Sequence, residues 1–213
     1  QHIIVPGDPS SAAFFMVAAS IVPGSDIIIG NVGLNPTRTG IITALRLMGA
    51  DITELNRRDV GGEPVAELRV RHTPLSAIDV PPELAPSMID EYPALFVAAA
   101  FANGRTVARG ADELRVKESD RIAAMASALT AIGARVEEFE DGLAITGSGG
   151  EALAGGATIA TRLDHRIAMS LAIAARHCRG SVTLDDASPV ATSFPGFFDT
   201  LESLSASNFQ ERA

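Results

Sequence analysis

The sequence has few aromatic residues and a single cysteine. Aromatics make up 5% of its 213 residues and tryptophan is absent, so the core has to be built mainly from alanine, valine, isoleucine and leucine. Such side chains suit helices layered on sheets. Because Cys178 has no partner for an internal disulfide, we expect a reducing, cytoplasmic setting. We interpret Cys178 as buried filler rather than as a nucleophile.

The sequence is also short of positive charge and of long apolar runs. Its 17 Lys and Arg stand against 26 Asp and Glu, a formal net charge of −9, which excludes the broad basic surface that nucleic acids require. The longest apolar stretch, residues 11–22, is interrupted by Pro23-Gly24 and is too short to span a bilayer. We therefore expect no nucleic-acid or membrane partner, whereas a few local cations can still bind a small anion.

Familiar nucleotide and zinc motifs are missing as well. The sequence contains neither G-x-x-x-x-G-K-[ST] nor G-x-G-x-x-G, and it has no Cys/His spacing typical of zinc. These absences argue against a nucleotide-dependent kinase and against a structural zinc site.

What the sequence does contain is a pattern in three copies. Each copy has an alanine-rich apolar segment, then a glycine, then a strand-like run, which predicts a buried helix that stops at the glycine and leads into a strand. The predicted helices and strands are 11–24 with 26–29, 92–104 with 106–108, and 165–180 with 181–184.

A second helix is expected in each copy, because apolar residues recur three and four positions apart. These helices are predicted over 37–48, 119–132 and 194–204. Strands over 66–70 and 142–146 follow in the first two copies, whereas the third has no clear strand there and should leave an open sheet edge. The pattern predicts one α/β (α+β) domain of three βαβαββ units, at about 1–78, 79–150 and 151–213, the third incomplete.

The densest polar run, residues 115–121, stands where the second helix of the second copy begins. Lys117 and Arg121 are four apart, so we expect them on one helix face. Lys117 is the only lysine beside 16 arginines, which indicates a position that needs a compact cation with rotatable protons. Arg166 stands in the first turn of another helix, and together with Arg121 it could clamp a carboxylate or phosphate.

An acid stands at the start of each alanine-rich helix: Asp8, Asp90 and Asp164. Asp is an ordinary helix cap, and we interpret Asp8 and Asp164 in that way. Three helix N-termini facing one side would nevertheless attract anions. His165 is a weaker candidate, because a lone histidine is more often structural.

Six motifs, in this order, resemble the 5-enolpyruvylshikimate-3-phosphate synthase family, in the style of its bacterial glyphosate-tolerant subgroup. They are 6–12, 35–40, 88–93, 114–121, 163–169 and 191–195. The family folds as two domains, each of three βαβαββ units around a pseudo-threefold axis, with the active site between them. The resemblance implies that this chain is the C-terminal domain alone, which the extreme N-terminus of the whole protein would complete.

The resemblance also implies a reaction. The family transfers the enolpyruvyl group of phosphoenolpyruvate to the 5-hydroxyl of shikimate 3-phosphate and releases phosphate, with no metal or organic cofactor. Such chemistry requires an acid, a base and cations for two anions. By resemblance the acid is Glu118, and the base that also holds the shikimate hydroxyl is Asp90. Lys117 would reach the shikimate ligand, while Arg121 and Arg166 would hold phosphoenolpyruvate with His165 beside them.

Two positions depart from the family. Glu113 stands where many relatives have an asparagine that contacts the shikimate ligand, and Thr192 stands where many have a lysine for phosphoenolpyruvate. Phosphate binding would then depend more on the two arginines. Because the N-terminal domain is absent, we expect the chain alone to be almost inactive and the full-length enzyme to be a monomer.

Two alternatives remain open. The sister transferase acting on UDP-N-acetylglucosamine has the same fold but normally uses a loop cysteine, and Cys178 is predicted late in an apolar helix. A noncatalytic anion-binding module could use the same repeat, but it would not need the acids and cations together.

Overall fold

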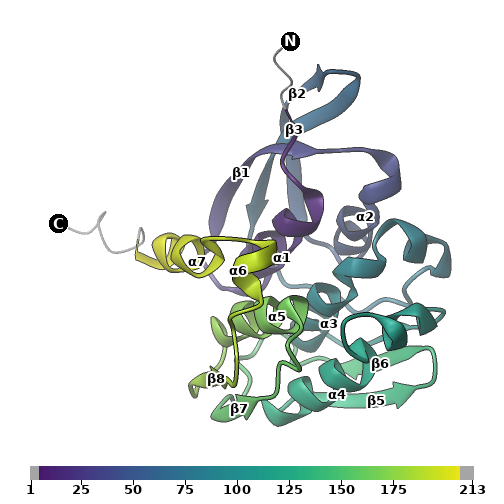
Figure 1. Ribbon diagram of the computed structural model, residues 1–213, viewed down its shortest axis with the longest axis vertical. Coiled ribbons are helices and arrows are strands. Elements are labelled where there is room, and N and C mark those ends of the chain that lie inside the picture. Colours follow the sequence, from purple (N-terminus) through teal and green to yellow (C-terminus); the bar gives the residue numbers. More distant parts are fainter. Residues whose placement is uncertain (1–4, 207–213) are drawn as a thin grey trace.

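Three alanine-rich helices pack against one another at the centre of the molecule (Figure 1). They are α1 (Pro9–Ile21), α3 (Tyr92–Phe101) and α5 (His165–Ala175). The computed structural model describes residues 5–206. Every residue of α3 is buried, because it lies between the other two helices and small side chains allow close approach. The three predicted helices are confirmed, although α5 ends at Ala175 and not near Gly180. Within the described residues, no helix combines the length and apolar character that crossing a bilayer requires.

The second helices lie beside these three, and those of the first two copies begin later than predicted. They are α2 (Gly40–Leu47) and α4 (Arg121–Ala131), followed in the third copy by α6 (Val190–Ser193) and α7 (Phe197–Ala206). A 3-10 turn, η1 (Pro36–Arg38), precedes α2. The helix predicted from residue 194 is wrong at its start, because Gly196 takes a left-handed φ of 80° and separates α6 from α7.

The first two copies end in antiparallel sheets of identical topology. In each sheet the last strand of the copy lies in the middle, in the order β1-β3-β2 and β4-β6-β5. The strands are β1 (Asp26–Gly33), β2 (Asp51–Val60), β3 (Glu63–Arg71), β4 (Arg105–Ala108), β5 (Arg135–Phe139) and β6 (Gly142–Thr146). The shared strand order supports the repeat that the sequence predicted.

The third sheet is smaller. Its two parallel strands are β7 (Ala157–Ile159), which the sequence did not predict, and β8 (Val182–Leu184). In the first two copies the place of β7 is taken by isolated parallel bridges, such as that between Gly7 and Val32. Among residues 5–206, β7 is the only strand that pairs with β8, so the expected open edge is present.

Short 3-10 segments precede two of the helices and set the position of the polar residues described below. They are η2 (Pro82–Ser87), η3 (Ile89–Glu91) and η4 (Asp112–Val116). The segment η3 leads directly into α3, and η4 ends five residues before α4 begins. Both segments therefore present their side chains close to helix N-termini.

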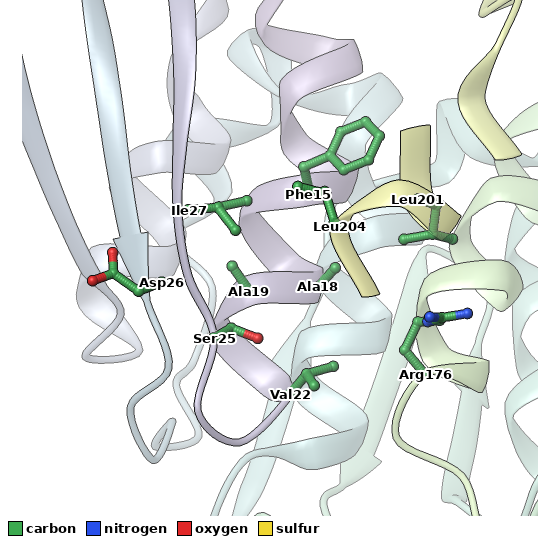
Figure 2. A pocket seen from close by; sticks show the side chains of 10 residues that line it. All are labelled: Phe15, Ala18, Ala19, Val22, Ser25, Asp26, Ile27, Arg176, Leu201 and Leu204. Carbon is green, nitrogen blue, oxygen red and sulfur yellow. The ribbon is translucent and has the colours of Figure 1, made fainter. Parts of the chain in front are cut away.

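The last helix is attached to the first by aromatic contacts. The ring of Phe197 lies 5.9 Å from that of Phe14 and 5.5 Å from that of Phe15, centroid to centroid. Beside this contact, a cavity of about 310 Å³ separates β1 from α7 (Figure 2). A second cavity, of about 430 Å³, shares its walls at Phe15, Ile27 and Leu204. A groove therefore runs between β1 and the last helix.

Two buried serines in the central helices allow a matched test of the packing. The hydroxyl of Ser170 in α5 has no hydrogen-bond partner among the described residues, whereas that of Ser20 in α1 donates to the Met16 carbonyl at 2.8 Å. We expect Ser170→Ala to raise the free energy of unfolding by about 1 kcal/mol and Ser20→Ala to lower it by about the same amount. Urea denaturation measures both, and a loss of stability in Ser170→Ala would contradict the assignment.

Candidate active site

Polar side chains gather where η3, the residues after η4 and the first turns of α4 and α5 meet. Ion pairs connect side chains from all four segments, so residues as far apart as Asp90 and Arg166 share one cluster. Cations in the first turn of a helix are unfavourable because they face the positive end of its dipole. Carboxylates from neighbouring segments offset that cost here.

Arg121, the first residue of α4, lies at the centre of the cluster. Its side chain is only 1% exposed, and each of its three guanidinium nitrogens donates to a carboxylate. Nε donates to Asp164 at 2.9 Å, Nη1 to Asp90 at 3.0 Å, and Nη2 to Glu118. A buried cation is tolerated only when it is paired in this way.

Asp164 has a larger role than the sequence indicated. Its carboxylate caps α5 by accepting from the backbone N–H of Arg166 at 2.9 Å, as predicted, but it also accepts from Arg121 and from the Ser119 hydroxyl. Its side chain is 0% exposed. Burial alone would raise the pKa of Asp164, yet the hydrogen bond and charge of Arg121 outweigh it and leave that pKa below its ordinary value.

Asp90 joins three cations. Its carboxylate lies 3.0 Å from Arg121, 3.6 Å from Arg166 and 3.7 Å from Lys117, measured between the nearest nitrogen and oxygen atoms. Burial acts to raise the pKa of Asp90, but the charges of Arg166, Lys117 and Arg121 together hold it below its usual value. Asp90 is therefore ionised at neutral pH.

Arg166 is mostly buried and is held from two sides. Its Nη1 donates to the backbone carbonyl of Asp90 at 2.9 Å and lies 3.5 Å from the Glu91 carboxylate. The Glu118 carboxylate and the Arg166 guanidinium thus lie on the same side of the molecule, linked through Arg121 and Asp90.

The expectation that Lys117 and Arg121 share one helix face is wrong. Lys117 follows η4 with an extended backbone, and Asp120 caps α4 by accepting from the N–H of Ala123, so no helix runs through both cations. Their charges meet at Asp90 instead. Lys117 also donates a hydrogen bond to the exposed carboxylate of Glu113, four residues earlier in the chain.

His165 and Cys178 lie near opposite ends of α5. Burial and the nearby charge of Arg166 lower the pKa of His165, so its ring is neutral at pH 7 beside the cluster. The sequence predicted Cys178 within this helix, but α5 ends before it, so Cys178 lies beyond the C-terminal end of α5. It is half-buried, and burial raises the pKa of its thiol, which agrees with a packing role.

The turn before α5 is strained. Arg162 and Leu163 both have left-handed backbones, with φ of 55° and 58°, which is costly for residues that carry a side chain. Thr161 anchors this turn, since its backbone N–H and hydroxyl both donate to Asp185 at 2.8 Å. The turn positions Asp164 and Arg166 in the cluster.

The cations of the cluster are outnumbered by acids. Lys117, Arg121 and Arg166 face the carboxylates of Asp90, Glu91, Glu113, Glu118 and Asp164. Of the three carboxylates on Arg121, that of Glu118 is the most exposed, at 52%. All three guanidinium nitrogens of Arg121 are paired, so an anion can bind them only if one of these carboxylates moves. Within residues 5–206, no group of three or more His, Cys, Asp and Glu side chains is arranged to hold a metal.

Comparison with known proteins identifies the family in which this cluster occurs. The family model described as EPSP synthase (3-phosphoshikimate 1-carboxyvinyltransferase) matches residues 1–201. The chain belongs to the EPSP synthase family. Relatives named 3-phosphoshikimate 1-carboxyvinyltransferase in Sphingopyxis alaskensis and Novosphingobium aromaticivorans are 68% and 63% identical to it. The matches cover 92% and 95% of this chain but 44% and 47% of those proteins, so it spans about half the length of the curated relatives.

Solved structures agree with the assignment to the EPSP synthase family. The structure of EPSP synthase from Acinetobacter baumannii superposes with a TM-score of 0.92 at 47% identity, over 95% of this chain and 46% of that one. The enolpyruvyl transferase NikO from Streptomyces tendae matches with a TM-score of 0.68 at 21% identity, over 95% of this chain and 43% of that one, which shows the shared fold alone.

The buried pair of Asp164 and Arg121 predicts a large loss of stability in Asp164→Asn. Removing one partner of a buried ion pair costs about 3–5 kcal/mol, whereas Asp26→Asn, which breaks the exposed pair with Arg69, should cost less than about 1 kcal/mol. Urea denaturation at pH 7 compares the two variants. Similar losses in both would contradict the assignment.

The same pair predicts how the loss depends on pH. Because the pKa of Asp164 is lowered, its stabilising effect is fully present above the ordinary value of 3.8 and disappears as the pH falls through the lowered pKa. The difference between the wild-type chain and Asp164→Asn should therefore shrink below about pH 4. A difference that stays constant from pH 7 to pH 3 would contradict this linkage.

Proposed function

We propose that this chain is the C-terminal half of an EPSP synthase and forms one wall of its active site. The whole enzyme would transfer the enolpyruvyl group of phosphoenolpyruvate to the 5-hydroxyl of shikimate 3-phosphate and release phosphate. The observation that carries the proposal is the carboxylate of Asp90 in contact with Lys117, Arg121 and Arg166, with Glu118 on the same arginine. Acids and cations that this reaction requires meet there within ion-pairing distance, 4 Å or less.

The two carboxylates suit different steps of the reaction. Asp90 is held ionised by its cations, as a group that accepts the proton of the shikimate hydroxyl has to be. Glu118 is half-exposed and can turn toward a ligand, which suits the acid that protonates the methylene carbon of phosphoenolpyruvate. The nearby guanidinium groups would stabilise the negative charge of the phosphate and carboxylate.

The cations divide between the two substrates in this proposal. Arg121 and Arg166, with His165 beside them, would bind phosphoenolpyruvate once Glu118 has moved away from Arg121. Lys117, which is hydrogen-bonded to Glu113, would approach the shikimate ligand near the reacting oxygen. No metal or organic cofactor is required in this scheme.

The remaining half of the enzyme would complete both the site and the fold. In the first two sheets, the strand after the central helix pairs with the last strand of its copy, as β1 does with β3 and β4 with β6. The corresponding strand β8 pairs only with β7 among the described residues. We propose that a segment from the other half pairs with β8, and that the full-length enzyme is a cytoplasmic monomer.

The two alternatives fit less well. A sister transferase would place a reactive cysteine at the site. Cys178 instead lies beyond the C-terminal end of α5, whereas His165 lies at its N-terminal end. A noncatalytic anion module would have no use for an ionised Asp90 and a movable Glu118 on one arginine. Titration with shikimate 3-phosphate, phosphoenolpyruvate and unrelated phosphates separates a specific site from a general anion binder.

The first test compares the chain alone with a hybrid enzyme, in which this chain replaces the stretch of the Sphingopyxis alaskensis relative that it matches. We expect the hybrid enzyme to release phosphate from the two substrates and the chain alone to be at least about 10³-fold slower, because half of the positioning groups are missing. Comparable turnover by both would show that the wall formed here suffices by itself, against the proposal.

The second test substitutes the acid and the lysine in the hybrid enzyme. Glu118→Gln should lower kcat by about 10²–10⁴-fold through loss of the proton donor, and Lys117→Met by about 10²-fold. Glu137→Gln is the matched control, because that exposed carboxylate pairs with Arg105 on a sheet outside the cluster. Near-normal rates in Glu118→Gln would reject the assignment of the acid.

A further inference from the structure

Arg115 lies next to the residues proposed for catalysis, but the scheme above does not use it. It directly precedes the 116–119 loop, which leads into α4 and carries Lys117 and Glu118. Every residue of the 116–119 loop is at least partly exposed, and Val116 is 81% exposed. Burial of apolar side chains therefore does not hold the loop in place, and its position has to depend on polar contacts.

The guanidinium of Arg115 joins the loop to a neighbouring hairpin. Its Nη1 donates to the carboxylate of Asp120 at 2.8 Å. Its Nε donates to the Glu140 carbonyl at 2.7 Å, and its Nη2 donates to the Phe139 carbonyl at 2.6 Å and to the Glu138 carboxylate at 3.0 Å. These last three acceptors lie at the end of β5 and in the turn to β6. The planar guanidinium offers its N–H groups in a fixed fork, so the bonds define its orientation.

Asp120 connects Arg115 to the start of α4. One of its carboxylate oxygens pairs with Arg115, while the other caps the helix by accepting from the N–H of Ala123 at 3.0 Å. The Ser119 hydroxyl, which donates to the buried Asp164 at 2.9 Å, fixes the same end of the loop. Arg115 itself holds the other end, and its pair with Asp120 closes the loop at its base.

The two charged side chains of the loop are paired with groups that the substrates would reach. Lys117 pairs with Asp90, and Glu118 pairs with Arg121. In the proposed function these pairs change when substrates bind, because Glu118 leaves Arg121 and Lys117 approaches the shikimate ligand. The acceptors of Arg115 have no part in substrate binding, so its bonds can hold the loop before and after the ligands enter.

We propose that Arg115 is a positioning residue that holds Lys117 and Glu118 in place for enolpyruvyl transfer. This inference rests on the proposed function. Arg115 does not need to touch either substrate. Arg121 and Arg166, which would bind phosphoenolpyruvate, are also held by acids outside the loop. Loss of Arg115 should therefore reduce kcat far more than the affinity for phosphoenolpyruvate.

The first test compares two arginines on the same hairpin in the hybrid enzyme. Arg115→Gln removes the fork, whereas Arg109→Gln removes an arginine that donates to Asp141 at 2.6 Å in the turn of the hairpin. Arg115→Gln should lower kcat by about 10²-fold, the effect of displacing catalytic groups by about 1 Å, and leave the KM for phosphoenolpyruvate within about twofold. Arg109→Gln should leave both within about twofold. Equal effects of the two variants would overturn the proposal.

Arg115→Lys tests the same assignment with the charge retained. Lysine can still pair with Asp120, but a single nitrogen replaces the three that reach Asp120 and the hairpin together. We expect kcat to fall by about 10-fold, between the values of the unsubstituted enzyme and Arg115→Gln. A loss as large as that in Arg115→Gln would count against the proposal, because a partial anchor should restore part of the rate. Arg115→Lys decides the matter if Arg115→Gln does not fold.

The second test needs no catalysis. Lys117 is the only lysine of the chain, so a lysine-specific protease cuts the 213-residue chain only within the loop. Arg115→Gln should be cut at least about 10-fold faster than the unsubstituted chain, and Arg109→Gln within about twofold of it. Urea denaturation gives the global stability of each variant. Unchanged cleavage in Arg115→Gln, or faster cleavage that global unfolding accounts for, would overturn the proposal.

The two tests separate failure of the positioning role from failure of the proposed function. An inactive unsubstituted hybrid enzyme would overturn the proposed function, and the cleavage rates would still decide whether Arg115 holds the loop. An active hybrid enzyme in which Arg115→Gln raises the KM for phosphoenolpyruvate and leaves kcat unchanged would overturn the positioning role alone.

Discussion

The buried guanidinium of Arg121 is the constraint on which the rest of the site depends. A cation that is 1% exposed, at the positive end of a helix, is stable only if carboxylates reach it from other segments. Asp164 supplies one from α5, and Asp90 supplies another from the turn before α3. Pairing with Arg121 thus joins the second copy of the repeat to the third. It lowers the pKa of Asp164, whereas the pKa of Asp90 is lowered by Arg166, Lys117 and Arg121 together.

The sequence predicted the central helices because their signals are local. Alanine-rich runs followed by glycine specify α1, α3 and α5 without knowledge of any neighbour. The site was predictable only in part. Asp164 is correctly a helix cap, but its bond to Arg121 joins residues 43 positions apart and leaves no local trace. Spacing misled for Lys117 and Arg121, since the four-residue rule assumes a helix that starts only at Arg121.

The threefold arrangement explains why a site can form from such dispersed residues. The central helices pack pairwise although 156 positions separate the starts of α1 and α5. The second and third copies contribute the charged groups.

The left-handed turn at Arg162 and Leu163 limits how far the stability of this region can be raised by substitution. Glycine at either position would remove a steric cost of about 1–2 kcal/mol. It would also enlarge the range of shapes open to the unfolded chain, which costs about 0.4–1 kcal/mol, and would let the turn sample more directions when folded. A substitution by glycine that raises the stability of this turn would therefore position the residues after the turn less precisely.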